Sequence, residues 1–150
     1  MPTVERSITM NEIKEYAEKL FEDIKHIDDN GNEYWVAREL QQVLEYKEWR
    51  KFNNVINKAT IACKNSKVII GQHFVQVDKT IRMPRNASKI INDYKLSRYA
   101  CYLIVQNADS KKEVIAFGQT YFAIQTRKQE LSEKEYSSLL KMRKDFIKEI

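Results

Sequence analysis

The residues of this chain that could carry out metal or nucleophilic chemistry are few and scattered. Its two cysteines, Cys63 and Cys101, lie 38 residues apart, and its two histidines, His26 and His73, have no ligand-type neighbour at a useful spacing. Zinc sites need clustered Cys and His ligands, and a nucleophilic cysteine needs a nearby base, so neither site is indicated. Cys101 falls in the apolar run YACYLIV, which predicts a buried, unreactive thiol.

Carboxylates are the remaining candidates for catalysis. Those of the first helical stretch fall between apolar residues, as is typical of a solvated helix face. The acidic turn over 28–32 lacks the later glutamate of an EF-hand loop, and its Asn-Gly pair is typical of a hairpin. The sequence has 3 glycines and no phosphate-cradling or hydrolase motif. We therefore expect no catalysis, no cofactor and no metal; a metal-dependent nuclease built from scattered carboxylates is the enzyme alternative.

Basic charge is the strongest chemical signal in the sequence. The 150 residues carry a net charge of +5, but the charge is unevenly distributed. Residues 1–46 hold 5 Lys/Arg against 11 Asp/Glu, residues 47–98 hold 12 against 3, and residues 99–150 hold 9 against 7. The central block, at +9, indicates a surface for a polyanion such as DNA; an acidic protein partner and a merely solvated surface are the alternatives.

The side chains that would meet DNA come from this basic block. Those predicted to contact phosphates are Arg50, Lys51, Lys58, Arg82, Arg85 and Lys89. Asn53, Asn54 and Asn57 would read adenine edges if their helix entered a groove, or would line a solvated helix face. Trp49 and Phe52 recur at helical spacing with the next apolar residues, so we expect them in the core rather than stacked on unpaired bases.

The elements that must position these residues are visible as periodic patterns. The first half contains a helix from the capping box Thr9–Glu12, a β-hairpin over 24–36 around Gly31, a helix over 37–44 and a helix over 48–65. An alternative continues the first helix to His26, in place of the first hairpin strand. The last two helices and the short turn between them resemble a helix-turn-helix in outline.

The second half begins with strands and ends with helices. Apolar runs predict short strands over 68–70, 74–77 and 90–94. Between the last two, residues 79–89 are expected to form a basic surface loop that could lie along phosphates or enter a groove. Ser97 predicts the start of one helix, and capping boxes at Ser110 and Ser132 predict a helix to about residue 128 and a last helix to residue 150.

The apolar stripe of that last helix is too wide to face solvent, so it predicts a surface buried against this domain, against a partner, or against sequence absent from this chain. The residues expected in such a partner or oligomer interface are Tyr136, Leu139, Leu140, Phe146 and Ile147.

Six stretches follow one another in an order that is typical of one protein family. They are FEDIKHID (21–28), YWVAREL (34–40), EWRKF (48–52), ATIAC (59–63), DYKLSRYACYLI (93–104) and QTYFAIQTR (119–127). Together they closely resemble the DinD (DNA-damage-inducible protein D) family of bacteria and mobile elements, and more distantly the BRO-N domain of phage antirepressors and viral proteins. The resemblance covers roughly residues 21–130.

The resemblance implies an α+β fold. A small BRO-N-like domain, with a β-hairpin and short strands packed on helices, is expected to precede a C-terminal helical extension. The division that follows is an N-terminal helix over 1–20, the BRO-N/DinD-like domain over 21–130, and an amphipathic helix over 131–150 that could begin a further helical region.

The function implied by the resemblance is that of a DNA-binding regulator of the DNA-damage response or of mobile-element control, without catalysis and acting on single- or double-stranded DNA. The alternative is a protein-interaction module, an antirepressor or a modulator of the RecA filament, which grips a partner protein and could form a homodimer. No apolar stretch approaches about 18 residues, so we expect a cytoplasmic protein that does not enter the membrane.

Overall fold

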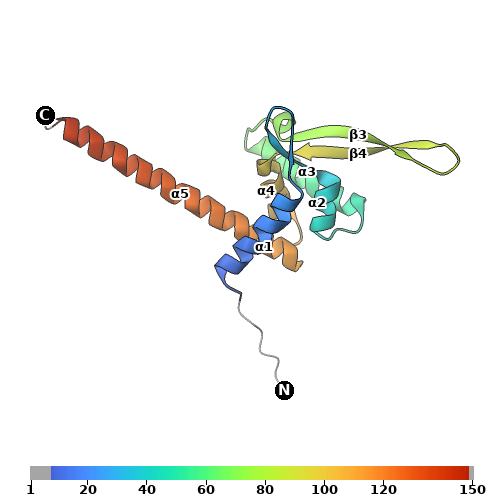
Figure 1. Cartoon of the computed structure of the whole chain (residues 1–150), viewed down its shortest axis with the longest axis horizontal. Helices are drawn as coiled ribbons and strands as arrows, with labels where there is room; N and C mark the ends of the chain where they lie inside the picture. The colour runs from blue at the N-terminus through green and yellow to red at the C-terminus, as the bar shows by residue number, and fades with distance from the viewer. Residues whose placement is uncertain (1–7, 149–150) are drawn as a thin grey trace, which may run out of the picture.

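The chain forms two pairs of antiparallel strands, with helices before, between and after them. Their order is α1 (Met10–Asp23), β1 (His26–Ile27), β2 (Glu33–Val36), α2 (Ala37–Val43), α3 (Trp49–Asn65), the 3-10 helix η1 (Ile70–Gln72), β3 (Phe74–Arg82), β4 (Ser88–Leu96), α4 (Arg98–Asn107) and α5 (Glu113–Lys148). The computed structural model describes residues 8–148 and, beyond residue 125, the side chains of 127, 137, 138 and 140–143. The strands form one antiparallel sheet in the order β1-β2-β4-β3 (Figure 1), which confirms the expected α+β fold.

Two of the predicted hydroxyl caps are formed. Thr9 Oγ1 accepts a hydrogen bond from the backbone N–H of Glu12 at 3.2 Å, and Ser97 Oγ accepts one from the N–H of Ala100 at 3.0 Å. Each bond satisfies a donor that the first turn of a helix otherwise leaves unpaired. These two residues therefore set where α1 and α4 begin.

The first hairpin follows α1 directly. Because α1 ends at Asp23 and β1 begins at His26, the alternative in which the helix continues to His26 is wrong. Gly31 lies in the turn at a φ of +82°, a conformation that favours glycine. Asp28 Oδ1 accepts from the backbone N–H groups of Asn30 and Asn32 at 2.9 and 2.8 Å, so this acidic turn is closed by its own backbone.

The predicted strand over 68–70 is wrong. Lys67 adopts a φ of +61° immediately after α3, and the chain then enters the 3-10 turn η1. Val68 and Ile70 pack against the core, whereas Ile69 between them is 64% exposed. An apolar run of three residues therefore covers the end of α3 here rather than joining the sheet.

The predicted basic surface loop over 79–89 is wrong in its extent, because the strands on either side continue into it and form a second hairpin. β3 and β4 each contain nine residues and pair from Phe74–Leu96 to Arg82–Ser88. Most of the basic segment 79–89 is therefore paired strand, and only 83–87 forms the turn, which contains Pro84. The N–H of Met83 donates to the carbonyl of Ala87 at 2.9 Å and closes that turn.

The last helix also differs from the prediction. α5 is a single helix of 36 residues, so the separate helix expected from Ser132 is wrong. No Gly or Pro follows residue 118, so nothing in the backbone interrupts the helix. Its start also lies beyond the box at Ser110, because Asp109 Oδ1 is the group that accepts from the N–H of Lys111, at 3.0 Å.

The core lies where the root of the sheet meets the helices. α4 contacts β2, β4 and α3, and α5 packs on α1 and α4. Phe52 is fully buried as predicted, and Trp49 lies half-buried at the edge of the core. Cys63 and Cys101 are both buried, and burial raises the pKa of each thiol, so the reactive thiolate is disfavoured.

Two elements project from this body. Figure 1 shows the β3–β4 hairpin extending from one side and α5 extending from the other. Across residues 8–148, no helix combines the length and the apolar character needed to cross a bilayer.

Candidate nucleic-acid interface

The outer part of the second hairpin forms a basic arm. We use the name β arm for residues 78–92, where every residue except Ile91 is exposed. This segment contains Lys79, Arg82, Arg85 and Lys89 and a single acid, Asp78. Arg85 and Asn86 turn the chain at the tip with φ values of +65° and +59°. The arm is thus a two-stranded ribbon with solvent on both faces and positive charge along its length.

A buried carboxylate holds the β arm to the body. Asp93 is fully buried, and its Oδ1 accepts from the backbone N–H groups of Arg38 and Tyr94 at 3.1 and 2.8 Å. Val36, at the cap position of α2, offers no side-chain acceptor, so Asp93 supplies from β4 the cap that α2 lacks. Its Oδ2 lies 2.9 Å from Lys79 Nζ, so the charge of that lysine is already neutralised.

The strand register sorts the arm's side chains onto two faces. Lys79 pairs with Ile91 and Ile81 pairs with Lys89, so these four side chains share one face. Arg82 lies on the other face, which also carries Ile90, 68% exposed. Each face therefore combines a cation with an exposed β-branched residue.

The exposed side of α3 supplies the second group of predicted contacts. Arg50, Lys51 and Lys58 lie on the solvent side of the helix, and Lys51 Nζ lies 3.9 Å from a Glu48 carboxylate oxygen. Asn54 and Asn57 lie on the same helix. The opposite side of the helix is the core face, with Phe52, Val55, Ile56, Ala59 and Cys63 buried.

Asn53 differs from the other two asparagines that were predicted to read bases. Its Oδ1 is buried with no hydrogen-bond partner among the described residues. Asn53 therefore turns its carbonyl toward the body, and Asn54 and Asn57 are the amides left for the surface.

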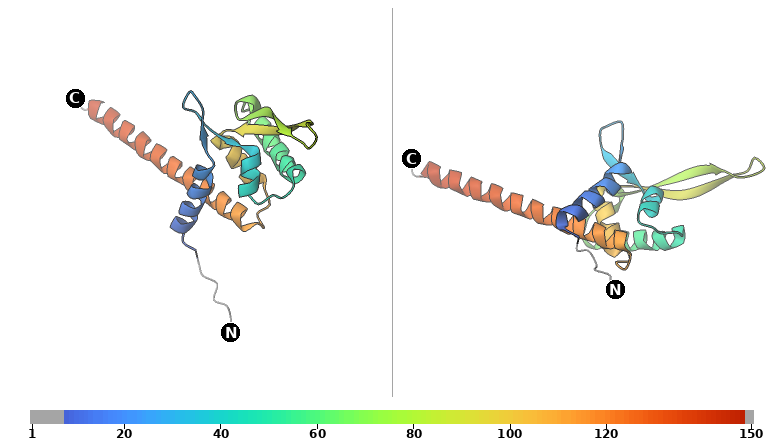
Figure 2. Two further views of the ribbon diagram at one scale, coloured as in Figure 1. Left: turned by 45° about the vertical axis from the view of Figure 1, so that its right-hand side comes forward. Right: turned by 60° about the horizontal axis from the view of Figure 1, so that its bottom comes forward.

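The six predicted phosphate contacts form two groups rather than one patch. Arg82, Arg85 and Lys89 gather near the tip of the β arm, and the other three lie along α3. α2 lies between these groups and contacts both β4 and α3. The right-hand view of Figure 2 shows the arm and the first turns of α3 extending toward the same side of the molecule.

Arg38 connects the two groups, and sequence reasoning missed it. Its Nε donates to the carbonyl of Asn92 at 2.8 Å, at the base of the β arm, and its guanidinium Cζ lies 4.1 Å from the centre of the Trp49 ring, at the start of α3. Arg38 belongs to the acidic first third of the chain, so a count of charges along the sequence hides it. The signal that could have found it is its position, two residues after a hairpin strand and in the first turn of the next helix.

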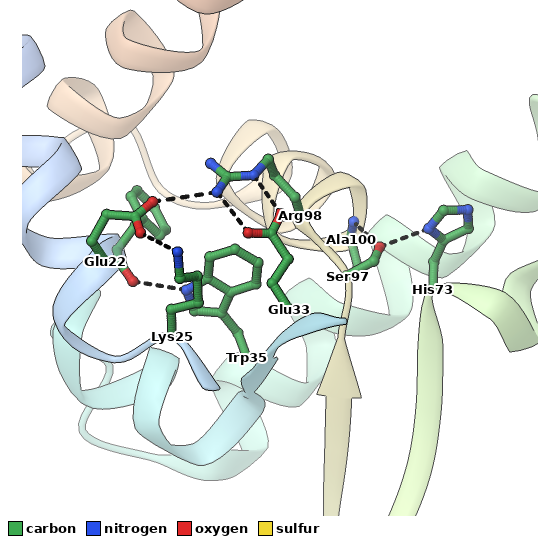
Figure 3. A network of polar contacts seen from close by, with 9 residues as sticks. Glu22, Lys25, Glu33, Trp35, His73, Ser97, Arg98 and Ala100 are labelled. Carbon is green, nitrogen blue, oxygen red and sulfur yellow. Dashed lines mark hydrogen bonds and ion pairs between the residues drawn. The ribbon is translucent and has the colours of Figure 1, made fainter. Parts of the chain in front are cut away.

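A second arginine, Arg98, forms the largest ion-pair cluster of the described chain (Figure 3). Its Nε and Nη2 donate to the two carboxylate oxygens of Glu33 at 2.9 and 3.0 Å, and Nη2 reaches Glu22 at 3.3 Å. Its Cζ lies 5.1 Å from the centre of the Trp35 ring, and the Trp35 indole N–H donates to the carbonyl of Phe21 at 2.9 Å. These contacts join α1, β2 and α4.

The charges of this cluster stabilise one another. The hydrogen bond from Lys25 lowers the pKa of Glu22, and the hydrogen bond from Arg98 lowers the pKa of Glu33. The carboxylate of Glu33 in turn raises the pKa of Arg98. Both glutamates are thus held in their ionised form, and the cluster fixes the fold around β2.

Each histidine has a partner that does not belong to a metal site. His26 Nε2 lies 2.7 Å from Glu39, and its ring stacks on Tyr34. His73 Nδ1 lies 2.6 Å from Ser97 Oγ, the hydroxyl that also caps α4 (Figure 3). Within the described part of the chain, no three His, Cys, Asp or Glu residues come together as a metal site.

Residues 23–123, which contain the β arm, both arginines and α3, match the BRO family, N-terminal domain. The chain belongs to this BRO-N family. It is also 51% identical over 115 residues to a protein of Escherichia coli (strain K12) named DNA damage-inducible protein D. This confirms the resemblance to DinD proteins. The aligned part is 77% of this chain and 42% of that protein, so the chain spans less than half the length of its relative. No solved structure gives a significant match.

The predicted sites divide along the limits of the BRO-N match. All six predicted phosphate contacts lie inside residues 23–123, and the predicted partner residues lie beyond it. Of the latter, Leu140 is 41% exposed, and the side chains of Tyr136, Leu139, Phe146 and Ile147 lie outside the described residues. The structure therefore places all six predicted phosphate contacts, but the side chain of only one of the five predicted partner residues.

Proposed function

We propose that this BRO-N chain is a regulatory DNA-binding domain that acts without catalysis. The observation that carries the proposal is the β arm, a ribbon exposed on both faces in which Arg82, Arg85 and Lys89 have no carboxylate partner among the described residues, against one exposed acid, Asp78. An isolated hairpin gains little stability from its own contacts, so residues in the arm contribute little to the core. The major groove of B-DNA admits a two-stranded ribbon of this kind.

The contacts in this proposal are mainly to phosphates. Arg82, Arg85 and Lys89 would bind from the arm, and Arg50, Lys51 and Lys58 would bind from α3. None of the six has a carboxylate partner closer than 3.9 Å among the described residues. Asn54 and Asn57 are the side chains of α3 that could reach base edges.

The biological setting is proposed from the relative. The Escherichia coli protein is named as DNA damage-inducible, and the family match extends across the arm and α3. We infer a cytoplasmic regulator in the DNA-damage response or in the control of mobile elements.

Fluorescence anisotropy of labelled single- and double-stranded DNA across a salt series tests the proposal. Three variants are compared with the wild-type chain: Arg82→Gln/Arg85→Gln/Lys89→Gln in the arm, Arg50→Gln/Lys51→Gln/Lys58→Gln in α3, and the control Lys19→Gln/Lys141→Gln/Arg143→Gln in α1 and α5. Each removes three positive charges. We expect the arm and α3 variants to bind at least about tenfold more weakly, and the slope of log K against log salt to fall by about 0.9 for each phosphate that the variant no longer neutralises.

The control variant should stay within about twofold of the wild type, because its charges lie away from both groups. Equal losses in all three variants would reduce the effect to net charge and contradict the assignment of the interface. Absence of wild-type binding at low salt would overturn DNA binding for this chain.

A protein-interaction function is the second candidate, favoured by α5. This helix extends from the body in Figure 1, and Leu140 and Met142 on it are 41% and 65% exposed. Such a helix could pack against a repressor, a recombinase filament such as RecA, or a second copy of the chain. This function gains support if the wild-type chain binds no DNA in the anisotropy experiment but sediments as a dimer.

A further inference from the structure

We propose that Arg38 is a phosphate-binding residue, whose guanidinium fork receives the two non-bridging oxygens of a phosphodiester between the β arm and α3. The inference rests on the proposed DNA-binding function and adds to it a site that neither the charge pattern nor the comparisons assign.

Arg38 is fixed from three directions. Its backbone N–H donates to Asp93 at 3.1 Å, its Nε donates to the Asn92 carbonyl at 2.8 Å, and its guanidinium lies over the Trp49 ring at 4.1 Å. A guanidinium has five N–H donors, and only the one on Nε is used in this way. The four donors on Nη1 and Nη2 have no acceptor among the described residues.

Arg38 is half-buried, but among the described residues only Asn53 Oδ1 and Asp93 Oδ2 are buried side-chain atoms without a hydrogen-bond partner, so the unpaired Nη1 and Nη2 of Arg38 are not shut off from solvent. An arginine that already has its rotamers fixed by stacking and by a hydrogen bond loses little further entropy when it binds an anion. The arrangement is therefore suited to a ligand with paired oxygens.

Arg98 shows what such an arrangement accepts. It too lies against a tryptophan, at 5.1 Å, and its fork is filled by the paired oxygens of Glu33 at 2.9 and 3.0 Å. Carboxylate and phosphate present two oxygens to a guanidinium in a similar bidentate geometry. Arg38 also lies over a tryptophan ring, that of Trp49, but no carboxylate among the described residues occupies its fork.

The surroundings of Arg38 favour a phosphate over a protein carboxylate. Arg50 and Lys51 directly follow the Trp49 ring on which it lies, and the basic arm begins at Asn92 beside its Nε. Glu48 is the acid next to Trp49 in sequence, and it lies 3.9 Å from Lys51. Asp78, which pairs with Asn92, is the exposed acid at the root of the arm, and the unpaired cations of the arm lie toward its tip. A phosphate chain that runs from the tip of the arm to α3 would therefore pass Arg38 between two basic groups.

The test compares Arg38→Gln, Arg38→Lys and Lys95→Gln with the wild-type chain, on the DNA that the wild type binds. Lys95 is a matched control, because it is a cation on the same strand as Asn92 and also lies over an aromatic ring, that of Tyr34, at 4.9 Å. We expect Arg38→Gln to bind about tenfold more weakly, with a salt slope smaller by about 0.9. Lys95→Gln should stay within about twofold with an unchanged slope.

Arg38→Lys separates phosphate binding from a purely structural role. Lysine keeps the charge but has no Nε donor for Asn92. If Arg38 has only a structural role, Arg38→Lys and Arg38→Gln should lose the same affinity. Both variants should then keep the wild-type slope of log K against log salt. Phosphate binding predicts that Arg38→Lys retains the slope and binds only about threefold more weakly. Thermal melting of each variant by circular dichroism confirms that the domain is folded.

The outcomes distinguish this inference from the proposed function. If the arm variant loses binding while Arg38→Gln keeps both the affinity and the slope of the wild type, the Arg38 inference alone is wrong. If the wild-type chain binds no DNA, both fail. If the wild type instead binds poly-glutamate and Arg38→Gln abolishes that binding, the fork belongs to a protein carboxylate and the phosphate assignment is overturned.

Discussion

Two arginine–tryptophan pairs in this chain resemble each other in their ring contact and differ in everything else around the guanidinium. Arg98 lies against Trp35 and has its fork occupied by Glu33 and Glu22. Arg38 lies against Trp49 and has only its Nε occupied, by a backbone carbonyl. The first pair closes contacts within the molecule, and the second leaves donors that another molecule can satisfy.

The burial of the two rings follows the same division. Trp35 is 1% exposed and donates its indole N–H to the protein, whereas Trp49 is half-buried at the edge of the core. A similar pair of side chains can thus serve the fold in one place and an interface in another. What decides between these uses is whether acidic residues from other elements reach the fork.

The largest expected difference is between the effects of removing the Trp35 ring and the Trp49 ring on the free energy of unfolding. Trp35→Ala should lower the free energy of unfolding by about 4 kcal/mol, because a large cavity opens in the core and the bond to Phe21 is removed. Trp49→Ala should cost about 1 kcal/mol, because its ring is already partly hydrated. Urea unfolding followed by circular dichroism measures both, with Trp35→Phe as the milder variant if the alanine form does not fold. Equal losses of unfolding free energy in Trp35→Ala and Trp49→Ala would contradict the view that Trp35 serves the fold and Trp49 an interface.

A smaller difference is expected between the two arginines. Arg98→Gln should destabilise the chain by about 1 kcal/mol, since it leaves two glutamates without their arginine partner at a site that is still partly solvated. Arg38→Gln should cost less, about 0.5 kcal/mol, because it removes one solvent-exposed hydrogen bond to a carbonyl and one ring contact but leaves no charged partner unpaired. The same urea titrations give both values. A larger loss for Arg38→Gln would mean that its main role is to hold the β arm.

The smallest expected effect is the loss of stability at acidic pH that depends on Glu33. The pKa of Glu33 is lowered from its ordinary value near 4.5, mainly by the hydrogen bond from Arg98, so its ionised form stabilises the fold above about pH 4.5. That contribution is lost as the pH falls through the lowered value in the folded state. Melting temperatures from pH 7 to pH 3 should show the wild type converging on Glu33→Gln below about pH 4.5.

Arg38→Gln provides the contrast for this pH experiment. No carboxylate among the described residues occupies the guanidinium fork of Arg38. The melting temperature of Arg38→Gln should therefore change with pH in the same way as that of the wild type. A constant gap between wild type and Glu33→Gln down to about pH 3 would show that Glu33 contributes through packing rather than through its charge.

Local signals were sufficient for much of the fold. The residue types at Thr9 and Ser97 predict caps, the Asn-Gly pair at Gly31 predicts a hairpin, and the period of the apolar residues predicts the buried face of α3; the structure contains all of these. Each of these features depends on residues within a few positions of one another, so the sequence pattern expresses them directly.

The wrong predictions also share a cause, which is that the structure at these positions depends on contacts or continuity beyond the local pattern. The run over 68–70 is as apolar as a strand but pairs with no strand of the described chain, and the capping box at Ser132 lies within a helix that no Gly or Pro interrupts. The outer residues 78–82 of β3 and 88–89 of β4 are not predicted as strand, because residues exposed on both faces show no alternation of apolar and polar side chains. Pairing with the other strand, rather than burial, keeps them extended.

The sequence by itself determined the α+β class, the boundaries of most helices, the inert cysteines and the central block of positive charge. Only the tertiary structure decided how that charge is arranged, because the arrangement depends on contacts between residues far apart in the chain. Asp93 reaches Arg38 and neutralises Lys79, while Glu33 fills the fork of Arg98 across 65 positions. Arg38, isolated in an acidic stretch of sequence, becomes a cation between two basic surfaces because folding places Asn92 and Trp49 on either side of it.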